Sequence, residues 1–373
     1  MIDINNRVQT VMDDLIGRGI EQGLQVAAYL DGQLVVDAWA GIADATTGRL
    51  VDGETLFPVW STTKGITATV IHLLVERGLL DYDAPVARYW PEFGVNGKQE
   101  ITLRQVLTHA AGVPQVPDGF GWADFGDWDR VCRAVAELTP LWEPGTATGY
   151  HALTFGWILG EVAQRVDGRP FKAIVQEDVC RPLGITSLYI GIPDEVEPRV
   201  AQMEPGSSAF PPPPPDALIW RAAPDLGRVH EHANAPGFRR AVIPAGNGIM
   251  NARSVARFYS ALACGEPDGV WLLSLERIRM ATKLQTAAVD LVLGVPVANA
   301  LGYALGGPFS AMGDRMSAFG HGGAGGSVGF ADPQYRFAIG FAKNRMVSSL
   351  PGEDAAYLIA REVRAALGIP EAG

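Results

Sequence analysis

Strand-like runs stand at both ends of this chain, whereas helical patterns fill its middle. At the start, residues 24–30 and 33–39 are apolar and β-rich, and Asp31-Gly32 between them is a dipeptide typical of tight hairpins. Similar runs near the other end cover residues 317–320, 327–331 and 337–343. Helical spacing of apolar residues predicts flanking helices at about residues 5–17 and 353–367.

This arrangement predicts an α+β fold. We expect one antiparallel sheet built from the N- and C-terminal segments and flanked by helices, with an all-helical lobe inserted between them. The expected boundaries give a sheet domain from residues 1–83 and 285–373 and a helical domain from residues 84–284. Clefts between two such lobes are common binding sites.

Ser61-Thr62-Thr63-Lys64 opens a helical pattern at the expected seam. Side chains three residues apart on a helix are neighbours, so the Lys64 amine can reach the Ser61 hydroxyl. A serine becomes a nucleophile when a base removes its proton, and a lysine kept neutral by burial can do so. The pattern indicates a nucleophile beside its base, although an exposed helix start with a solvated lysine would carry the same residues.

Tyr150 follows a turn-rich loop, residues 143–149, and precedes a helical pattern. A tyrosine at a loop end can project its phenol into a cleft, where a lysine cation would lower its pKa. We therefore take Tyr150 as the candidate partner of Ser61 and Lys64. A packed surface aromatic is the alternative.

Ser327 lies in Gly325-Gly326-Ser327-Val328-Gly329, which matches the G-x-S-x-G elbow of the α/β-hydrolases. That elbow must open a helix and be followed by a histidine, but the last histidine, His321, precedes Ser327. We therefore reject Ser327 as nucleophile. The glycines near it are expected to let the backbone approach a ligand.

Composition limits the partners. The net charge of −11 over 373 residues, without basic patches, argues against nucleic acid and anionic membrane surfaces. We see neither a secretion signal nor a membrane-spanning run.

No paired motif is formed by Cys132, Cys180 and Cys264, which favours a cytoplasmic protein. His230 and His232 lack an evident third ligand, so we expect neither metal nor cofactor. The oligomeric state is left open.

Two loops are candidates for the cleft wall. In residues 119–128, the rings of Trp122 and Phe125 either line an acyl pocket or anchor the loop. The five prolines of residues 211–215 must be extended, and they form either a stiff surface loop or a rim of the cleft.

Taken together, these motifs resemble the serine β-lactamase and penicillin-binding-protein superfamily, and most of all its class C β-lactamase-like esterases, the family VIII carboxylesterases. The resemblance covers nearly the whole chain. The matching segments are Ser61 to Lys64, Leu107 to Pro114, Glu143 to Gly145 before Tyr150, Arg181 to Ile185, and His321 to Gly323. It implies that Ser61 is acylated, that Lys64 and Tyr150 form the base pair, and that the N–H groups of Ser61 and Ala324 form the oxyanion hole.

Two positions depart from the β-lactamase pattern. Ala152 replaces the asparagine that holds the acylamino group of a β-lactam, and His321 replaces the lysine of a Lys-Thr-Gly triad. With Gly322, Gly323, Trp122 and Phe125, these residues are the candidate substrate contacts. Both departures suit neutral esters, so we expect a serine hydrolase that cleaves small carboxylic esters. The alternatives are an acyltransferase on the same site, weak β-lactamase or peptidase activity, and a non-catalytic binding module.

Overall fold

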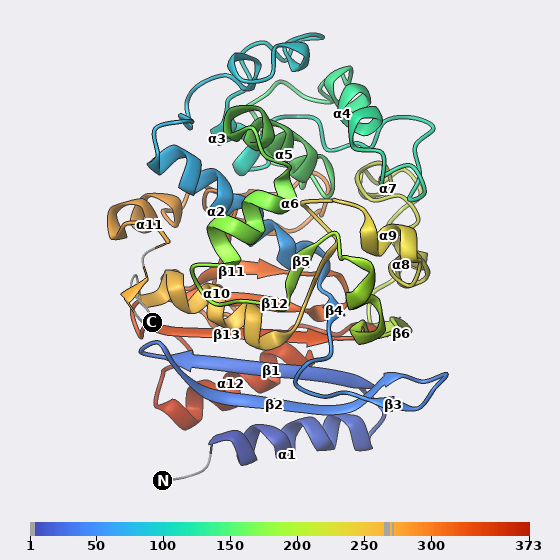
Figure 1. Ribbon diagram of the computed structural model, residues 1–373, viewed down its shortest axis with the longest axis vertical. Helices are drawn as coiled ribbons and strands as arrows, with labels where there is room; N and C mark the ends of the chain where they lie inside the picture. Colours follow the sequence, from blue (N-terminus) through green and yellow to red (C-terminus); the bar gives the residue numbers. More distant parts are fainter. Residues whose placement is uncertain (1–3, 265–268, 271) are drawn as a thin grey trace.

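An antiparallel sheet forms the lower half of the molecule in Figure 1, which shows a computed structural model. Residues 4–264, 269–270 and 272–373 are described, so the remaining parts of both expected domains lie outside the described residues. Within this range the sheet has nine strands in the order β3-β2-β1-β13-β12-β11-β10-β9-β8. They are β1 (Gly23–Leu30), β2 (Gln33–Asp44), β3 (Arg49–Leu50), β8 (Thr286–Val289), β9 (Pro296–Asn299), β10 (Ala304–Leu305), β11 (Phe319–Gly322), β12 (Val328–Asp332) and β13 (Phe337–Lys343).

Strands from the two ends of the chain pair in the interior of this sheet. β1 pairs with β13, with Leu24 opposite Lys343 and Leu30 opposite Phe337. Asp31 and Gly32 both take left-handed conformations, with φ of 51° and 76°, as a two-residue hairpin turn requires. The predicted antiparallel sheet from both terminal segments is confirmed.

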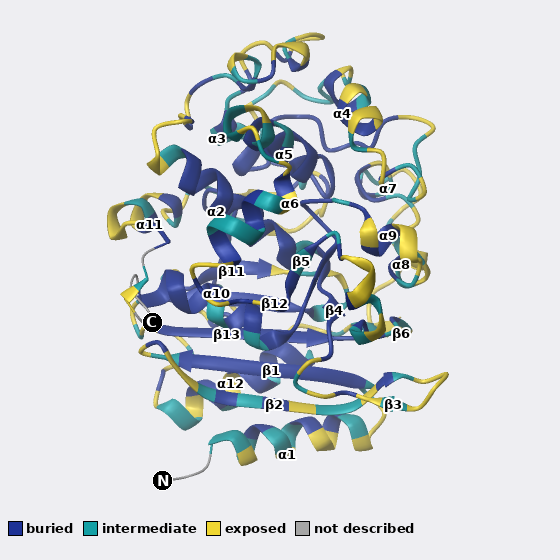
Figure 2. Cartoon of the chain, viewed as in Figure 1, coloured by how far each residue is buried: buried dark blue, intermediate teal, exposed yellow. Residues whose placement is uncertain are grey.

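Helices cover both faces of the sheet. α1 (Ile4–Gly17) and α12 (Ala355–Leu367) share one apolar core with the sheet, and α10 (Ala252–Cys264) packs on β13, β1 and β12. Figure 2 shows the buried sides of these helices facing the strands. α10 can come close because β13 presents Gly340, where a Cβ atom would lie 2.4 Å from the Ala252 carbonyl oxygen. α10 therefore covers the sheet, although its residues fall in the range expected for the helical domain.

The upper lobe in Figure 1 is mainly helical. Its helices are α2 (Thr63–Glu76), α3 (Leu103–Leu107), α4 (Trp128–Ala136), α5 (Thr154–Asp167), α6 (Phe171–Ile174), α7 (Ile219–Ala222), α8 (Val229–Ala233), α9 (Pro236–Arg240) and α11 (Leu275–Ala281). α2 is buried over nearly its whole length and contacts both α5 and β11. No helix in the described ranges is long and apolar enough to cross a membrane.

The structure also has short strands that the sequence did not reveal, and three of them lie in the segment that was expected to be all-helical. β4 (Phe57–Pro58), β7 (Gly248–Met250) and β5 (Leu188–Ile190) form a small sheet in that order, and β6 (Glu204–Ser208) pairs with β14 (Arg345–Ser348). Runs of two to five residues are too short to show the alternation that predicts a strand. β4 and β7 nevertheless matter, because they lead directly into the candidate site.

Candidate active site

Ser61 lies on a 3-10 turn, Trp60–Thr62, between β4 and α2. Trp60 has φ of 51°, a left-handed conformation that is strained for a bulky residue. The Thr63 hydroxyl donates to the Trp60 carbonyl oxygen and accepts a hydrogen bond from Gly248 N at 2.8 Å, which ties the turn to β7. The turn therefore holds Ser61 immediately before the first turn of α2.

Lys64 Nζ lies 3.0 Å from Ser61 Oγ, as the spacing predicts. The same amine also donates to the carbonyl oxygens of Ala152, at 2.7 Å, and Ala245, at 2.9 Å. Lys64 is fully buried, and this burial lowers its pKa well below the usual value. A neutral amine has two N–H donors, which the two carbonyls accept, and one lone pair that can take the proton of Ser61.

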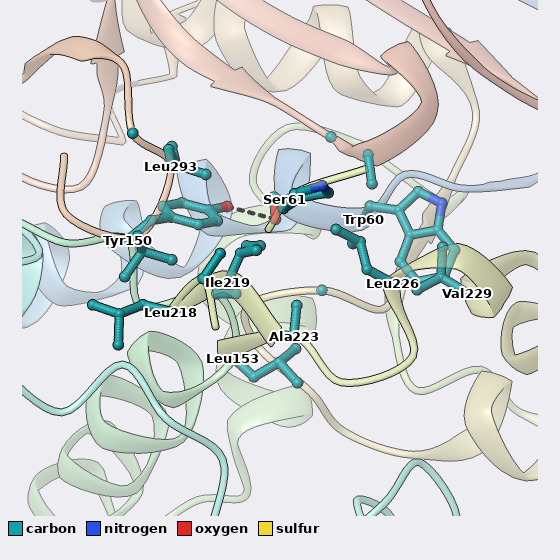
Figure 3. A pocket seen from close by; sticks show the side chains of 18 of the residues that line it. Trp60, Ser61, Tyr150, Leu153, Leu218, Ile219, Ala223, Leu226, Val229 and Leu293 are labelled. Carbon is teal, nitrogen blue, oxygen red and sulfur yellow. Dashed lines mark hydrogen bonds between the residues drawn. The ribbon is translucent and has the colours of Figure 1, made fainter. Parts of the chain in front are cut away.

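Tyr150 is the second side chain on this oxygen, because its phenol donates to Ser61 Oγ at 2.7 Å (Figure 3). Burial raises the pKa of Tyr150, and the nearby Asp290 carboxylate adds to this effect. The expectation that a Lys64 cation would lower this pKa was wrong. A buried lysine with a lowered pKa supplies no lasting positive charge, whereas a phenolate in the same place would lose its hydration.

Two histidines hold the Tyr150 segment in place. Gly149 N donates to the His109 carbonyl oxygen at 2.9 Å, and His151 N donates to His109 Nδ1 at 3.2 Å. His151 Nε2 accepts from Val113 N at 3.0 Å. Neither histidine was among the candidate site residues that the sequence offered. The available signal was the segment from Leu107 to Pro114, which contains His109 and belongs to the resemblance.

Ser327 connects the loop between β11 and β12 to the Ser61 turn. Its hydroxyl donates to the Val59 carbonyl oxygen at 2.7 Å and lies 3.3 Å from Thr62 Oγ1. Neither partner can remove its proton. Gly323 is required at this junction, because a Cβ atom there would lie 2.2 Å from the Val59 carbonyl oxygen. Ser327 therefore has a structural role as a buried hydrogen-bonding residue. Ala324, one residue beyond Gly323, lines the same cavity as Ser61.

This cavity has a volume of about 650 Å³ and a mostly apolar wall (Figure 3). The predicted site residues on its wall are Ser61, Trp122, Tyr150, Ala152, Gly322, Gly323 and Ala324. Further lining residues, which the sequence did not single out, are Trp60, Leu153, Ala217, Leu218, Ile219, Ala223, Leu226, Val229, Gly246, Leu291, Val292, Leu293 and Gly294. Pro213 and Pro214 also line it, so the proline run forms part of the rim.

Two of the predicted substrate contacts, Phe125 and His321, are not in the wall of this cavity. Phe125 is 1% exposed and stands behind Trp122, with ring centroids 5.2 Å apart, outside the described wall of the cavity. It packs against Trp122 from outside the wall of the larger cavity. His321 lines a separate, smaller cavity on the Tyr150 side. Burial lowers its pKa to about 3, so it is neutral at pH 7.

His232, one of the two histidines considered for a metal, stacks on Trp122 with ring centroids 5.1 Å apart. Over the described ranges, no group of three or more His, Cys, Asp or Glu side chains is arranged to hold a metal ion. His232 therefore has a packing role at the back of the cavity wall.

Known proteins resemble this chain over most of its length. Residues 8–364 match the family described as β-lactamase. The chain is 38% identical to the esterase/β-lactamase LipL of Mycobacterium tuberculosis over 357 residues, which cover 88% of this chain and 78% of LipL. A crystal structure of a family VIII carboxylesterase superposes with a TM-score of 0.87 at 35% identity, covering 97% of both chains. The crystal structure of a penicillin-binding-protein homologue from Caulobacter crescentus superposes with a TM-score of 0.88 at 35% identity, covering 98% of this chain and 97% of that chain.

Proposed function

This chain belongs to the β-lactamase family, and on that premise we propose that it is a serine hydrolase that cleaves carboxylic esters through an acyl intermediate on Ser61. The observation that carries the proposal is the position of Ser61 Oγ, which lies 3.0 Å from a buried amine and 2.7 Å from a phenol. Both groups meet this oxygen at the wall of an apolar cavity.

In the acylation step, Lys64 takes the Ser61 proton as Oγ bonds to the ester carbonyl carbon. The N–H groups of Ser61 and Ala324 receive the oxyanion. As the ester C–O bond breaks, Tyr150 gives its phenol proton to the departing alcohol oxygen, and the Lys64 ammonium returns a proton to Tyr150. In deacylation, a water molecule gives a proton to the Lys64–Tyr150 pair as it attacks the acyl carbon. The bond between that carbon and Ser61 Oγ then breaks, and Oγ takes the proton back.

Neutral esters suit this site better than β-lactams. Ala152 presents a methyl group where an amide would hold an acylamino group, and its carbonyl is already engaged by Lys64. His321 is neutral at pH 7 and so provides no cation for a substrate carboxylate. A small-molecule ester is therefore the proposed substrate. We also propose a cytoplasmic location, which the three free, buried cysteines suit.

A fluorophosphonate probe tests the nucleophile directly. We expect the wild-type protein to hydrolyse p-nitrophenyl butyrate and to take up one equivalent of the probe, with the adduct on the peptide that contains Ser61. Intact mass and peptide mapping measure both the amount and the position. An adduct elsewhere, or none with no hydrolysis, would contradict the proposal.

The pH dependence should report the state of Lys64. The amine is a base only when neutral, so kcat/KM should rise with pH through the pKa of Lys64 and level off well below 10.5, its ordinary pKa. Because burial raises the pKa of Tyr150, the phenol keeps its proton over the same range. The measurement is a pH–rate profile with p-nitrophenyl butyrate under conditions in which acyl transfer limits the rate. A rate that kept rising to pH 10 would argue against a neutral buried lysine.

A further inference from the structure

A second cavity lies behind Tyr150. It has a volume of about 230 Å³, and its lining includes His109, Tyr150, Asp290, Tyr303 and His321. It shares only Tyr150, Leu293 and Gly322 with the larger cavity described above. Its size suits a small chemical group and not a second drug-sized ligand.

Asp290 is the unusual member of this lining. Its side chain is 1% exposed, and Oδ1 accepts three backbone hydrogen bonds, from Tyr150 N at 3.0 Å, Val292 N at 2.8 Å and Leu293 N at 2.9 Å. Oδ2 is equally buried and has no hydrogen-bond partner among the described residues. A buried carboxylate oxygen without a partner is costly, so it marks a place where a cationic group would be stabilised.

The rest of the lining is compatible with a positive charge. The rings of His109 and Tyr150 have centroids 4.9 Å apart, those of Tyr150 and His321 6.2 Å apart, and the faces of tyrosine rings attract cations. Burial keeps both histidines neutral, because it lowers the pKa of His321 to about 3 and that of His109 well below its usual value. Lys64 Nζ lies 4.7 Å from the centroid of the Tyr150 ring, but burial lowers its pKa as well.

His321 adds an acceptor. Its Nδ1 lies 2.6 Å from the Gly322 carbonyl oxygen, and because a carbonyl can only accept, Nδ1 carries the ring proton. The neutral ring therefore has its lone pair on Nε2. His321 and Asp290 thus both contribute acceptors to the lining, which suits a ligand group that is cationic or rich in donors.

The chemistry on Ser61 determines which part of an ester would reach this cavity. The alcohol oxygen must take its proton from the Tyr150 phenol, so the alcohol part departs on the Tyr150 side. The acyl part, attached to the carbon that Ser61 attacks, then occupies the larger apolar cavity with Trp60 and Trp122. The second cavity also has Tyr150 in its lining, so we assign the alcohol part to it.

We propose that the cavity behind Tyr150 binds an ammonium group on the alcohol part of the ester, held by the Asp290 carboxylate and the surrounding rings. This inference rests on the proposed function, because it assigns the alcohol to one side of Ser61. The favoured substrates are esters of an apolar acid with an amino alcohol or a quaternary ammonium alcohol.

Butyrylcholine and its uncharged carbon analogue, in which a tert-butyl group replaces the trimethylammonium group, form the test pair. We expect the wild-type protein to hydrolyse butyrylcholine with a kcat/KM about tenfold higher than that of the analogue. Asp290→Asn keeps an oxygen for the three backbone N–H groups but removes the charge, so the ratio should fall to about one. Asp194→Asn removes a carboxylate whose side chain is 82% exposed and should keep the wild-type ratio.

The outcomes separate this inference from the proposed function. Equal rates for the two esters, with p-nitrophenyl butyrate still hydrolysed and Ser61 still labelled, would overturn the ammonium site alone. A ratio that persists in Asp290→Asn would overturn the role of this carboxylate. Absence of hydrolysis of every ester, with no label on Ser61, would overturn the proposed function and this inference with it. The wild-type comparison decides even where the variant does not fold.

Discussion

Replacing Ser61 with alanine is expected to lower kcat/KM for p-nitrophenyl butyrate by on the order of 10⁴-fold or more and to abolish fluorophosphonate labelling. Ser61 Oγ is the atom on which the Lys64 amine and the Tyr150 phenol converge, so no other group takes its place when it is removed. The fold should persist, because the substitution removes only the hydroxyl oxygen from a partly exposed position. Initial rates and intact mass measure the two effects, and circular dichroism checks the fold.

Ser327→Ala is the matched control, since it also removes one serine hydroxyl near the same cavity. It takes one hydrogen-bond donor from the Val59 carbonyl oxygen, which still accepts from Thr62 N, and should cost about 0.5–1.5 kcal/mol in the free energy of unfolding. The protein should still be labelled, and its kcat/KM should stay within about tenfold of the wild-type value. Loss of labelling in Ser327→Ala with retention in Ser61→Ala would show that the elbow motif, and not Ser61, carries the nucleophile.

The parts of this site that could be predicted are the ones that local geometry determines. Ser61 and Lys64 are three residues apart at a helix start, so their contact follows from the pitch of a helix. The hairpin at Asp31-Gly32 follows in the same way from the left-handed conformations that a two-residue turn needs. The strand patterns at the two ends predicted the sheet itself, because apolar runs there have few other places to be buried.

The sequence did not show which residues far apart in the chain come into contact. Asp290 contacts Tyr150 across 140 positions, and no motif in the sequence singled it out. Trp122 and Phe125 lie three residues apart in one loop, and no pattern distinguished the ring that lines the cavity from the one behind it. The direction of the Tyr150 pKa also depended on how deeply Lys64 is buried, which spacing alone does not determine.

Replacing Lys64 with methionine is expected to lower kcat/KM by about 10³-fold, because the variant keeps an apolar chain of similar length but has no base for Ser61. The acidic limb of the pH–rate profile should disappear from the residual activity, since the group that titrates there is gone. A rate within tenfold of the wild type, or an unchanged limb, would show that another group accepts the Ser61 proton. The profile distinguishes this outcome from a merely structural loss, which would lower the rate without removing the limb.

Lys98→Met is the control for Lys64→Met. It removes a buried amine that is not next to Ser61, so it shows how much of the effect of Lys64→Met comes from losing any buried amine and how much from losing the base. Lys98 is also fully buried, its amine donates to the carbonyl oxygens of Val95 and Leu138, and burial lowers its pKa to about 8. Its removal leaves the Leu138 carbonyl oxygen without this donor, whereas the Val95 carbonyl oxygen still accepts from the backbone N–H of residue 98, so it should cost about 1–3 kcal/mol, seen as a lower midpoint of urea unfolding. The folded fraction should keep a kcat/KM within about threefold of the wild-type value and an unchanged pH profile. If both lysine variants lost activity equally, the role of Lys64 would be to satisfy buried carbonyls, and Tyr150 would be the remaining candidate for the base.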